Sequence, residues 1–346
     1  MDAALDERKA AILTKIVRGY VRQGEPIGSK RLTEEMDIGV SAATVRADMA
    51  ALEDAGYITQ PHTSAGRVPT DLGYRFFVNT LTRWPTASPE QRLAVEELLL
   101  GAGDLEDLLR RASSVLSRLT RFAALVVAPG LDTSRIRHVE LVHLGPHSVL
   151  AVLIADTGRV DKRMLALDRT VSEADVHRAR HVVNEAVSGL SPRHAAEVVS
   201  GMQPAAPEEL AGLLSAVADT MVRSLAGAES GDQLFLGGTA NMVSAGYFNR
   251  LEEVKQVYET IEEQVVVLGM LREALAAGDP AVRIGGELPL VELTACSVVA
   301  ASYETGGGAG GSLGVLGPTR MDYPRTLAAV QAVASSLEKA LAELVD

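Results

Sequence analysis

The stretch that decides the fold lies at residues 41–69 and reads SAATVRADMAALEDAGYITQPHTSAGRVP. It opens with a serine, a residue that caps helices by accepting a backbone N–H, and continues with apolar residues at helical spacing. A glycine then interrupts the pattern, and two short extended pieces at 57–59 and 68–69 enclose a polar loop. The stretch therefore predicts a helix over residues 41–55 followed by a two-stranded β-hairpin.

Two further helices are predicted before this stretch. Apolar residues at i, i+4 and i+8 predict a helix over residues 6–22, and the Gly-Glu-Pro that follows ends it. Ser29 is the expected N-cap of a short helix over residues 30–36. A Gly-containing turn joins that short helix to the helix over 41–55, which is the plan of a helix-turn-helix.

The second helix of such a pair enters the major groove of DNA. On residues 41–55 the larger apolar side chains share one side and three alanines share the other. Alanine methyls can touch thymine methyls, and Arg46 can reach a guanine edge or a phosphate. The alternative interpretation is an ordinary amphipathic helix with an exposed alanine face. The candidate DNA contacts on this helix and the one before it are Ser29, Lys30, Arg31, Ser41, Ala43, Thr44, Arg46, Ala47 and Ala50.

The polar loop of the hairpin is predicted to form a wing that lies along a phosphate backbone or in the minor groove. It offers small hydroxyls, backbone amides and a cation, and a further helix over residues 71–81 follows it. We do not expect zinc at the histidine of this loop, because no second ligand stands near it in the sequence. The candidate contacts here are His62, Thr63, Ser64, Gly66 and Arg67. Residues 1–84 are thus predicted to be a winged helix-turn-helix DNA-binding domain.

Residues 26–32 (PIGSKRL) and 40–78 (VSAATVRADMAALEDAGYITQPHTSAGRVPTDLGYRFFV) resemble the signature of the HrcA family, the heat-inducible transcription repressors of bacterial chaperone operons. The resemblance implies a sequence-specific repressor that binds double-stranded DNA with an inverted repeat as a homodimer and releases it on heat shock. It also implies a chaperonin as modulator, which keeps the repressor active. For the fold, it implies a GAF-like domain interrupted by an inserted dimerisation domain.

The net charge of −12 is unevenly distributed along the chain. Residues 1–84 hold eleven Lys and Arg against eleven Asp and Glu, so the remainder carries the whole negative charge. A neutral DNA-binding domain is acceptable because only its contacting face must be positive. The sequence contains no apolar run long enough for a membrane span and no secretory signal, so we expect a cytoplasmic protein without a membrane partner.

The rest of the chain predicts an α+β multidomain fold. Residues 85–103 read as a linker and a helix, and the break at 85–89 is expected to set the placement of the N-terminal domain. Residues 136–229 predict a three-stranded antiparallel sheet followed by helices, which is the candidate dimerisation domain. Strands and helices over 104–135 and 230–346 are assigned to the GAF-like domain.

No motif in the sequence points to catalysis, a cofactor or a metal. Cys296 is the single cysteine and is expected in a buried strand. The glycine run 306–311 lacks the lysine and helix of a P-loop and predicts a hairpin tip. His138 and His143 should face opposite sides of one strand, which disfavours a metal site. Two alternatives stay open: a ligand-gated regulator or enzyme whose GAF-like domain binds a small metabolite, and a winged helix used only for protein contacts.

Overall fold

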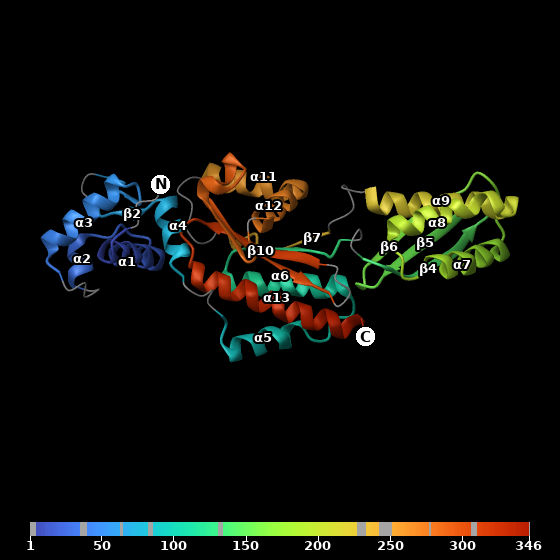
Figure 1. The fold of residues 1–346 in the computed structure, drawn as a ribbon, viewed down its shortest axis with the longest axis horizontal. Helices are drawn as coiled ribbons and strands as arrows, with labels where there is room; N and C mark the ends of the chain where they lie inside the picture. Colours follow the sequence, from blue (N-terminus) through green and yellow to red (C-terminus); the bar gives the residue numbers. More distant parts are fainter. Residues whose placement is uncertain are drawn as a thin grey trace.

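The computed structural model describes residues 5–34, 40–62, 65–81, 86–130, 134–226, 233–241, 251–276, 278–305 and 310–345. Figure 1 shows three parts in a row, with the N-terminal helices at one end and a three-stranded sheet with its helices at the other. We name the described residues of 5–81 the head, those of 86–130 and 233–345 the body, and 134–226 the insert. The fold mixes helix and sheet, and among the described helices none combines the length and apolarity that a bilayer crossing requires.

The head contains the predicted helices and hairpin. These are α1 (Glu7–Gln23), α2 (Ser29–Glu34), α3 (Ala42–Asp54), β1 (Ile58–Thr59), β2 (Val68–Pro69) and α4 (Asp71–Asn79), with β1 and β2 antiparallel. The predicted cap at Ser29 is wrong, because Ser29 is already helical and the carbonyl oxygen of Gly28 accepts the Leu32 N–H. The turn predicted around Gly39 lies outside the described residues.

One pairing in the head is absent from the sequence prediction. Ile27, just before α2, pairs with Arg67 in an antiparallel bridge, and each N–H donates to the other's carbonyl oxygen at 2.9 Å. The chain between α1 and α2 therefore lies against the second strand of the hairpin. This contact ties the start of the helix-turn-helix to the wing.

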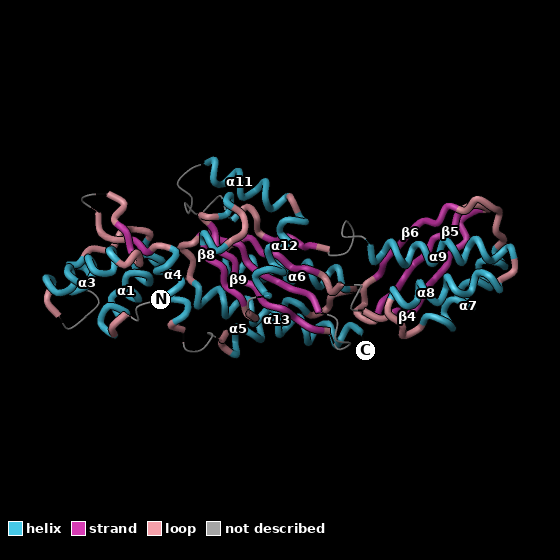
Figure 2. The backbone as a smooth tube through the Cα atoms, turned by 45° about the horizontal axis from the view of Figure 1, so that its top comes forward, coloured by secondary structure: helices cyan, strands magenta, loops and turns pink. Residues whose placement is uncertain are grey.

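The body is built on a five-stranded antiparallel sheet in the order β7-β3-β10-β9-β8. Its strands are β3 (Ala123–Val127), β7 (Leu234–Gly237), β8 (Ala281–Ile284), β9 (Cys296–Glu304) and β10 (Gly310–Pro318). Helices α6 (Leu105–Thr120) and α13 (Tyr323–Val345) cover one face, with α5 (Pro89–Leu99) outside them, and α11 (Leu251–Glu262) and α12 (Gln264–Ala276) lie on the other, as Figure 2 shows.

Three predictions for the body need correction or lie outside the description. The sequence predicts that residues 249–276 are helical, and their described part forms two helices: α11 ends at Glu262 and α12 begins at Gln264. The apolar run Leu293–Tyr303 predicts a strand, but β9 begins only at Cys296, because Val291–Leu293 forms a 3-10 turn, η3. Cys296 is buried in β9, as expected. Of the glycine run, residues 306–309 lie outside the described residues.

The insert has the predicted three-stranded sheet in the order β4-β5-β6. Its elements are β4 (Ile136–Gly145), β5 (Ser148–Ala155), β6 (Val160–Ala166), α7 (Glu173–Val187), α8 (Pro192–Met202), the 3-10 turn η1 (Gln203–Ala205) and α9 (Glu208–Ala226). The helices pack on one face of this sheet and enclose a hydrophobic core of their own.

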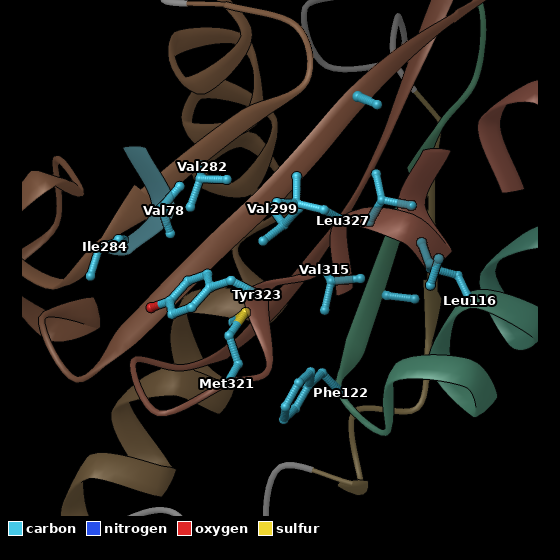
Figure 3. Packing of buried hydrophobic residues seen from close by; sticks show 14 of the residues in the cluster. Val78, Leu116, Phe122, Val282, Ile284, Val299, Val315, Met321, Tyr323 and Leu327 are labelled. Carbon is cyan, nitrogen blue, oxygen red and sulfur yellow. The ribbon is translucent and has the colours of Figure 1, made fainter. Parts of the chain in front are cut away.

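Head and body share one core, in contrast to the insert. A single hydrophobic cluster runs from α1 and α3 through α4 to α6, β9 and α13. Figure 3 shows its junction, where Val78 of α4 lies near Val282 and Ile284 of β8 and near Tyr323 of α13. The body thus supports the head directly through buried apolar contacts.

Candidate nucleic-acid interface

Helix α3 is held on the head by its inward side. Val45, Met49 and Leu52 are buried, as their spacing predicts. Asp48 is buried beside them, and its carboxylate accepts two hydrogen bonds from Arg8 of α1, at 2.7 and 3.1 Å. This bidentate pair fixes α3 on α1 and was not predicted. The sequence did hold a sign of this pair, because Asp48 lies three residues after Val45 and four before Leu52, on the apolar side of the helix.

The opposite side of α3 faces solvent. Ala43, Ala47 and Ala50 are exposed, as the sequence predicts, and so is Arg46 on their flank. The predicted cap is confirmed at Ser41, whose Oγ accepts the Thr44 N–H at 3.2 Å. The exposed side therefore presents small methyl groups with one long cation beside them, a surface that can approach base edges closely.

The structure brings residues of α2 next to this surface. The Arg46 Nε donates to the Ser29 Oγ at 3.3 Å, so these two predicted contacts lie together. The side chain of Lys30 is 83% exposed, with Glu34 at 3.8 Å as its salt-bridge partner. Arg31 is half-buried on the same short helix. Helices α2 and α3 thus offer their candidate side chains around one surface.

Two residues predicted to contact DNA, Gly66 and Arg67, also hold the wing in place. The Arg67 guanidinium pairs with Glu53 of α3, with its Nε 2.9 Å from Oε2, and is largely covered. A Cβ on Gly66 would lie 2.5 Å from the Ile27 carbonyl oxygen, so only glycine permits this approach of the wing. Both residues hold the wing against the helix-turn-helix. His62 is exposed, and Thr63 and Ser64 lie outside the described residues.

One face of the body's sheet bears on the metabolite-binding alternative. Aliphatic side chains fill the space between the five-stranded sheet and helices α11 and α12, among them Leu125, Val267 and Leu271. Each of these three is completely buried. On this face, the described residues form a packed hydrophobic core.

Comparisons with known proteins point to one family. The family model described as HrcA protein C terminal domain matches residues 106–327. A Nocardia farcinica protein named heat-inducible transcription repressor HrcA is 43% identical over 344 residues, covering 99% of each chain. A Nocardioides protein of the same name is 46% identical over 339 residues, covering 98% of this chain and 99% of its own.

A solved structure described as a hypothetical protein has the same fold, with a TM-score of 0.66 at 24% identity, and covers 99% of this chain and 100% of its own. The family match spans most of the body and the insert, and the identity to the named relatives extends through the head as well. The resemblance found in the sequence is therefore confirmed, and the chain belongs to the HrcA family.

Proposed function

We propose that this chain is a transcription repressor of heat-shock chaperone operons that binds DNA through its head. The observation that carries the proposal is the solvent-facing side of α3, where three alanines and Arg46 lie on a helix locked to α1 by the Asp48–Arg8 pair. A helix of this kind fits the major groove. The relatives named heat-inducible transcription repressor HrcA support the same function.

In the proposed complex, α3 lies in the major groove with its alanines against thymine methyls. Arg46 reads a guanine or binds the adjoining phosphate, and the wing follows the DNA backbone. Gly66 and Arg67 contribute by holding the wing in place, since their described contacts are with Ile27 and Glu53. The other proposed contacts are Ser29, Lys30, Arg31, Ser41, Ala43, Thr44, Ala47, Ala50, His62, Thr63 and Ser64.

We assign residues 1–84 to a winged helix-turn-helix domain and 136–229 to an inserted dimerisation domain. Residues 104–135 and 230–346 form the proposed GAF-like domain, and 85–103 connect it to the head. Two observations support these bounds. Strands β3 and β7 pair in one sheet although the insert separates them in the sequence, and the insert encloses its own core.

The open face of the insert's sheet supports a homodimer. The helices cover the other face, and the side chains that alternate outward are mostly apolar. Across the three strands they form the rows Val142–Leu150–Met164, Glu140–Val152–Lys162 and His138–Ile154–Val160. Exposure reaches 39% for Val142, 47% for Val160 and 62% for Met164. A contiguous apolar patch of this kind marks an interaction surface.

The middle row carries two opposite charges, Lys162 and Glu140, and Glu140 also accepts a hydrogen bond from Arg180 of α7 at 2.6 Å. A two-fold axis parallel to β5 places β4 of one copy over β6 of the other, so Glu140 meets Lys162 of the second copy twice. A two-fold axis across the strands would instead set Glu140 against Glu140. Electrostatic complementarity therefore favours the first arrangement. Such a dimer requires an inverted-repeat operator.

A charge exchange tests the dimer. We expect Lys162→Glu to weaken association at least about tenfold, because like charges then face each other across the interface. The double variant Glu140→Lys with Lys162→Glu should recover most of the affinity, measured by analytical ultracentrifugation. An unchanged dimer in the single variant would place the interface elsewhere.

Operator binding tests the function itself. Arg46→Ala should cost about 1–3 kcal/mol of specific binding if the side chain reads a base, measured by gel shift on an inverted-repeat duplex and on scrambled DNA. Arg110→Ala, which removes a largely exposed cation of the body, is the matched control and should bind like the wild type. If the wild type does not prefer the inverted repeat over scrambled DNA at moderate salt, the proposed function is wrong.

The resemblance also supports release of DNA on heating and a chaperonin that keeps the repressor active in the cytoplasm. A purified chaperonin with ATP should then restore operator binding to heat-treated repressor. Recovery of binding without the chaperonin, to the same extent and at the same rate, would contradict this part of the proposal.

A further inference from the structure

Helix α4 follows the second strand of the wing directly and packs against the body. Strand β2 ends at Pro69, and Thr70 is the N-cap of α4. The Thr70 side chain donates to the Gly56 carbonyl oxygen at 2.6 Å, and its N–H donates to the Tyr57 carbonyl oxygen at 3.1 Å. The start of α4 is thus bonded to the segment that links α3 to β1. Any displacement of α4 must carry the wing and α3 with it.

The first two turns of α4 are held by polar contacts to the body. The Arg75 Nε donates to Glu287 Oε1 at 2.7 Å, and its Nη2 contacts Glu287 Oε2 and donates to the Val282 carbonyl oxygen at 2.7 Å. One turn earlier, Asp71 Oδ2 accepts the Gly286 N–H at 3.0 Å. We call Asp71, Arg75, Gly286 and Glu287 the clamp. Its two acidic groups and one cation come from both sides of the junction.

On the body side of the clamp, the backbone turn after β8 leaves room for the start of α4. Glu287 also accepts the Ile284 N–H at 3.0 Å, which closes the 3-10 turn η2 (Gly285–Glu287) after β8. Gly285 has a φ of +53°, and a Cβ there would lie 2.1 Å from Asp71 Oδ2. Glycine therefore supplies both the left-handed backbone and the space that Asp71 occupies.

Aromatic contacts continue the junction beside the clamp. Tyr74 packs against Tyr323 of α13 with 5.8 Å between ring centroids, and the Arg320 guanidinium lies over the Tyr20 ring at 5.7 Å. The Tyr74 hydroxyl is buried at this junction without a hydrogen-bond partner among the described residues. Because a buried unpaired hydroxyl destabilises the structure that encloses it, the junction depends on the surrounding contacts to stay closed.

We propose that the clamp sets the position of the DNA-binding head on the body, and that Asp71, Arg75 and Glu287 are positioning residues for operator spacing. The proposal rests on the proposed function. In a two-fold dimer, the placement of each head on its body fixes the distance and angle between the two recognition helices. With the clamp broken, the head keeps its apolar contacts with the body, among them Val78 against Val282, but its orientation is held less tightly. Binding of both half-sites then costs the entropy of ordering the two heads, and the dimer binds operators with a wider range of half-site spacings.

The test uses full-length protein and duplexes selected by the wild type from a random inverted-repeat library. The spacer between the half-sites is then lengthened and shortened by single base pairs, and affinity is followed by fluorescence anisotropy. The wild type should show a sharp maximum at one spacing. Arg75→Ala and Glu287→Gln should bind that duplex at least about tenfold more weakly and show a flattened spacing profile. Affinity for a single half-site should be unchanged, and Arg75→Lys should restore part of the sharpness.

Lys339→Ala is the matched control, since it breaks a 2.6 Å ion pair with Glu96 inside the body and should keep the wild-type profile. The proposal is overturned if Arg75→Ala keeps the wild-type spacing profile. It is also overturned if Arg75→Ala loses as much affinity for a single half-site as for the full operator, because Arg75 would then be needed for the fold of the head.

Small-angle scattering and hydrogen exchange test the clamp without DNA. Arg75→Ala must broaden the distribution of interatomic distances and speed exchange in α4, and failure of both also overturns it. Absence of operator binding in the wild type would instead count against the proposed function.

Discussion

The head and the insert are attached to the body in opposite ways. The head contributes its apolar side chains to a core that continues into the body, and polar contacts reinforce the junction. The insert encloses its own core, and its described contact with the body includes the Arg159 side chain, which donates to the Pro129 carbonyl oxygen at 3.0 Å. The head, which precedes the body in the sequence, therefore packs as part of the body. The insert, which interrupts the body's sequence, forms a separate core.

The sequence order of the segments and their physical coupling are therefore separate properties of this chain. Segments that share a buried core unfold together, and segments with separate cores can unfold independently. We expect two cooperative units in this chain, one made of head and body and one made of the insert.

The first prediction compares matched core truncations in the two units. Ile284 of β8 and Leu214 of α9 are both buried, at 0% and 2% exposure. Each change to alanine should destabilise its own unit by about 2–5 kcal/mol. In differential scanning calorimetry, Ile284→Ala should lower the transition of head and body, and Leu214→Ala that of the insert. A single transition that shifts equally in both variants would contradict the division.

The second prediction concerns two tyrosines at the junction of head and body. Tyr74→Phe removes a buried hydroxyl without a described partner and should stabilise that unit by up to about 1 kcal/mol. Tyr323→Phe should have the opposite effect, because its hydroxyl lies 2.9 Å from the Ser297 Oγ and donates to the Thr319 carbonyl oxygen at 2.7 Å. Chemical denaturation measures both. Equal losses in the two variants would show that the Tyr74 hydroxyl is satisfied in solution.

The third and smallest effect is a pH dependence of the insert. Hydrogen bonds from Ser172 and Arg178 lower the pKa of Asp175 from 3.8 to about 2. Because the folded pKa lies below the ordinary value, the stabilisation is complete above about pH 4 and is lost as the pH falls toward 2. Asp175→Asn should flatten this dependence in the insert's transition. An equal acid sensitivity in wild type and variant would assign the effect to other groups.

Local features of the head could be predicted from the sequence. The cap at Ser41 and the inward and outward sides of α3 follow from residue type and helical spacing alone, and the structure agrees. The hairpin turns of the insert are equally local, so its three-stranded antiparallel sheet could also be predicted. The Ser29 cap was placed one residue too late, because Gly28 supplies the first helical carbonyl through its backbone, which no side-chain pattern reveals.

Contacts between distant segments could not be predicted. Arg75 and Glu287 are 212 residues apart, and nothing in either neighbourhood identifies the other. Arg67 was expected to face DNA as a cation of the wing, yet its partner Glu53 is visible only once the hairpin folds back on α3. The break between α11 and α12 is also hidden, because no glycine or proline marks it in the sequence. The residue type shows that these charged side chains can form ion pairs, but only the tertiary fold determines their partners.

The pairing of β3 with β7 has a consequence for the evolution of this fold. Val127 at the end of β3 is the partner of Leu234 at the start of β7, and the ladder continues where the Ala128 N–H donates to the Gln233 carbonyl oxygen at 3.0 Å. The whole insert thus occupies the place of a hairpin turn. A tight turn between β3 and β7 would close the same sheet. A single insertion or deletion at that position can therefore add or remove the proposed dimerisation domain. Recognition and assembly can therefore evolve as separate traits on one chain.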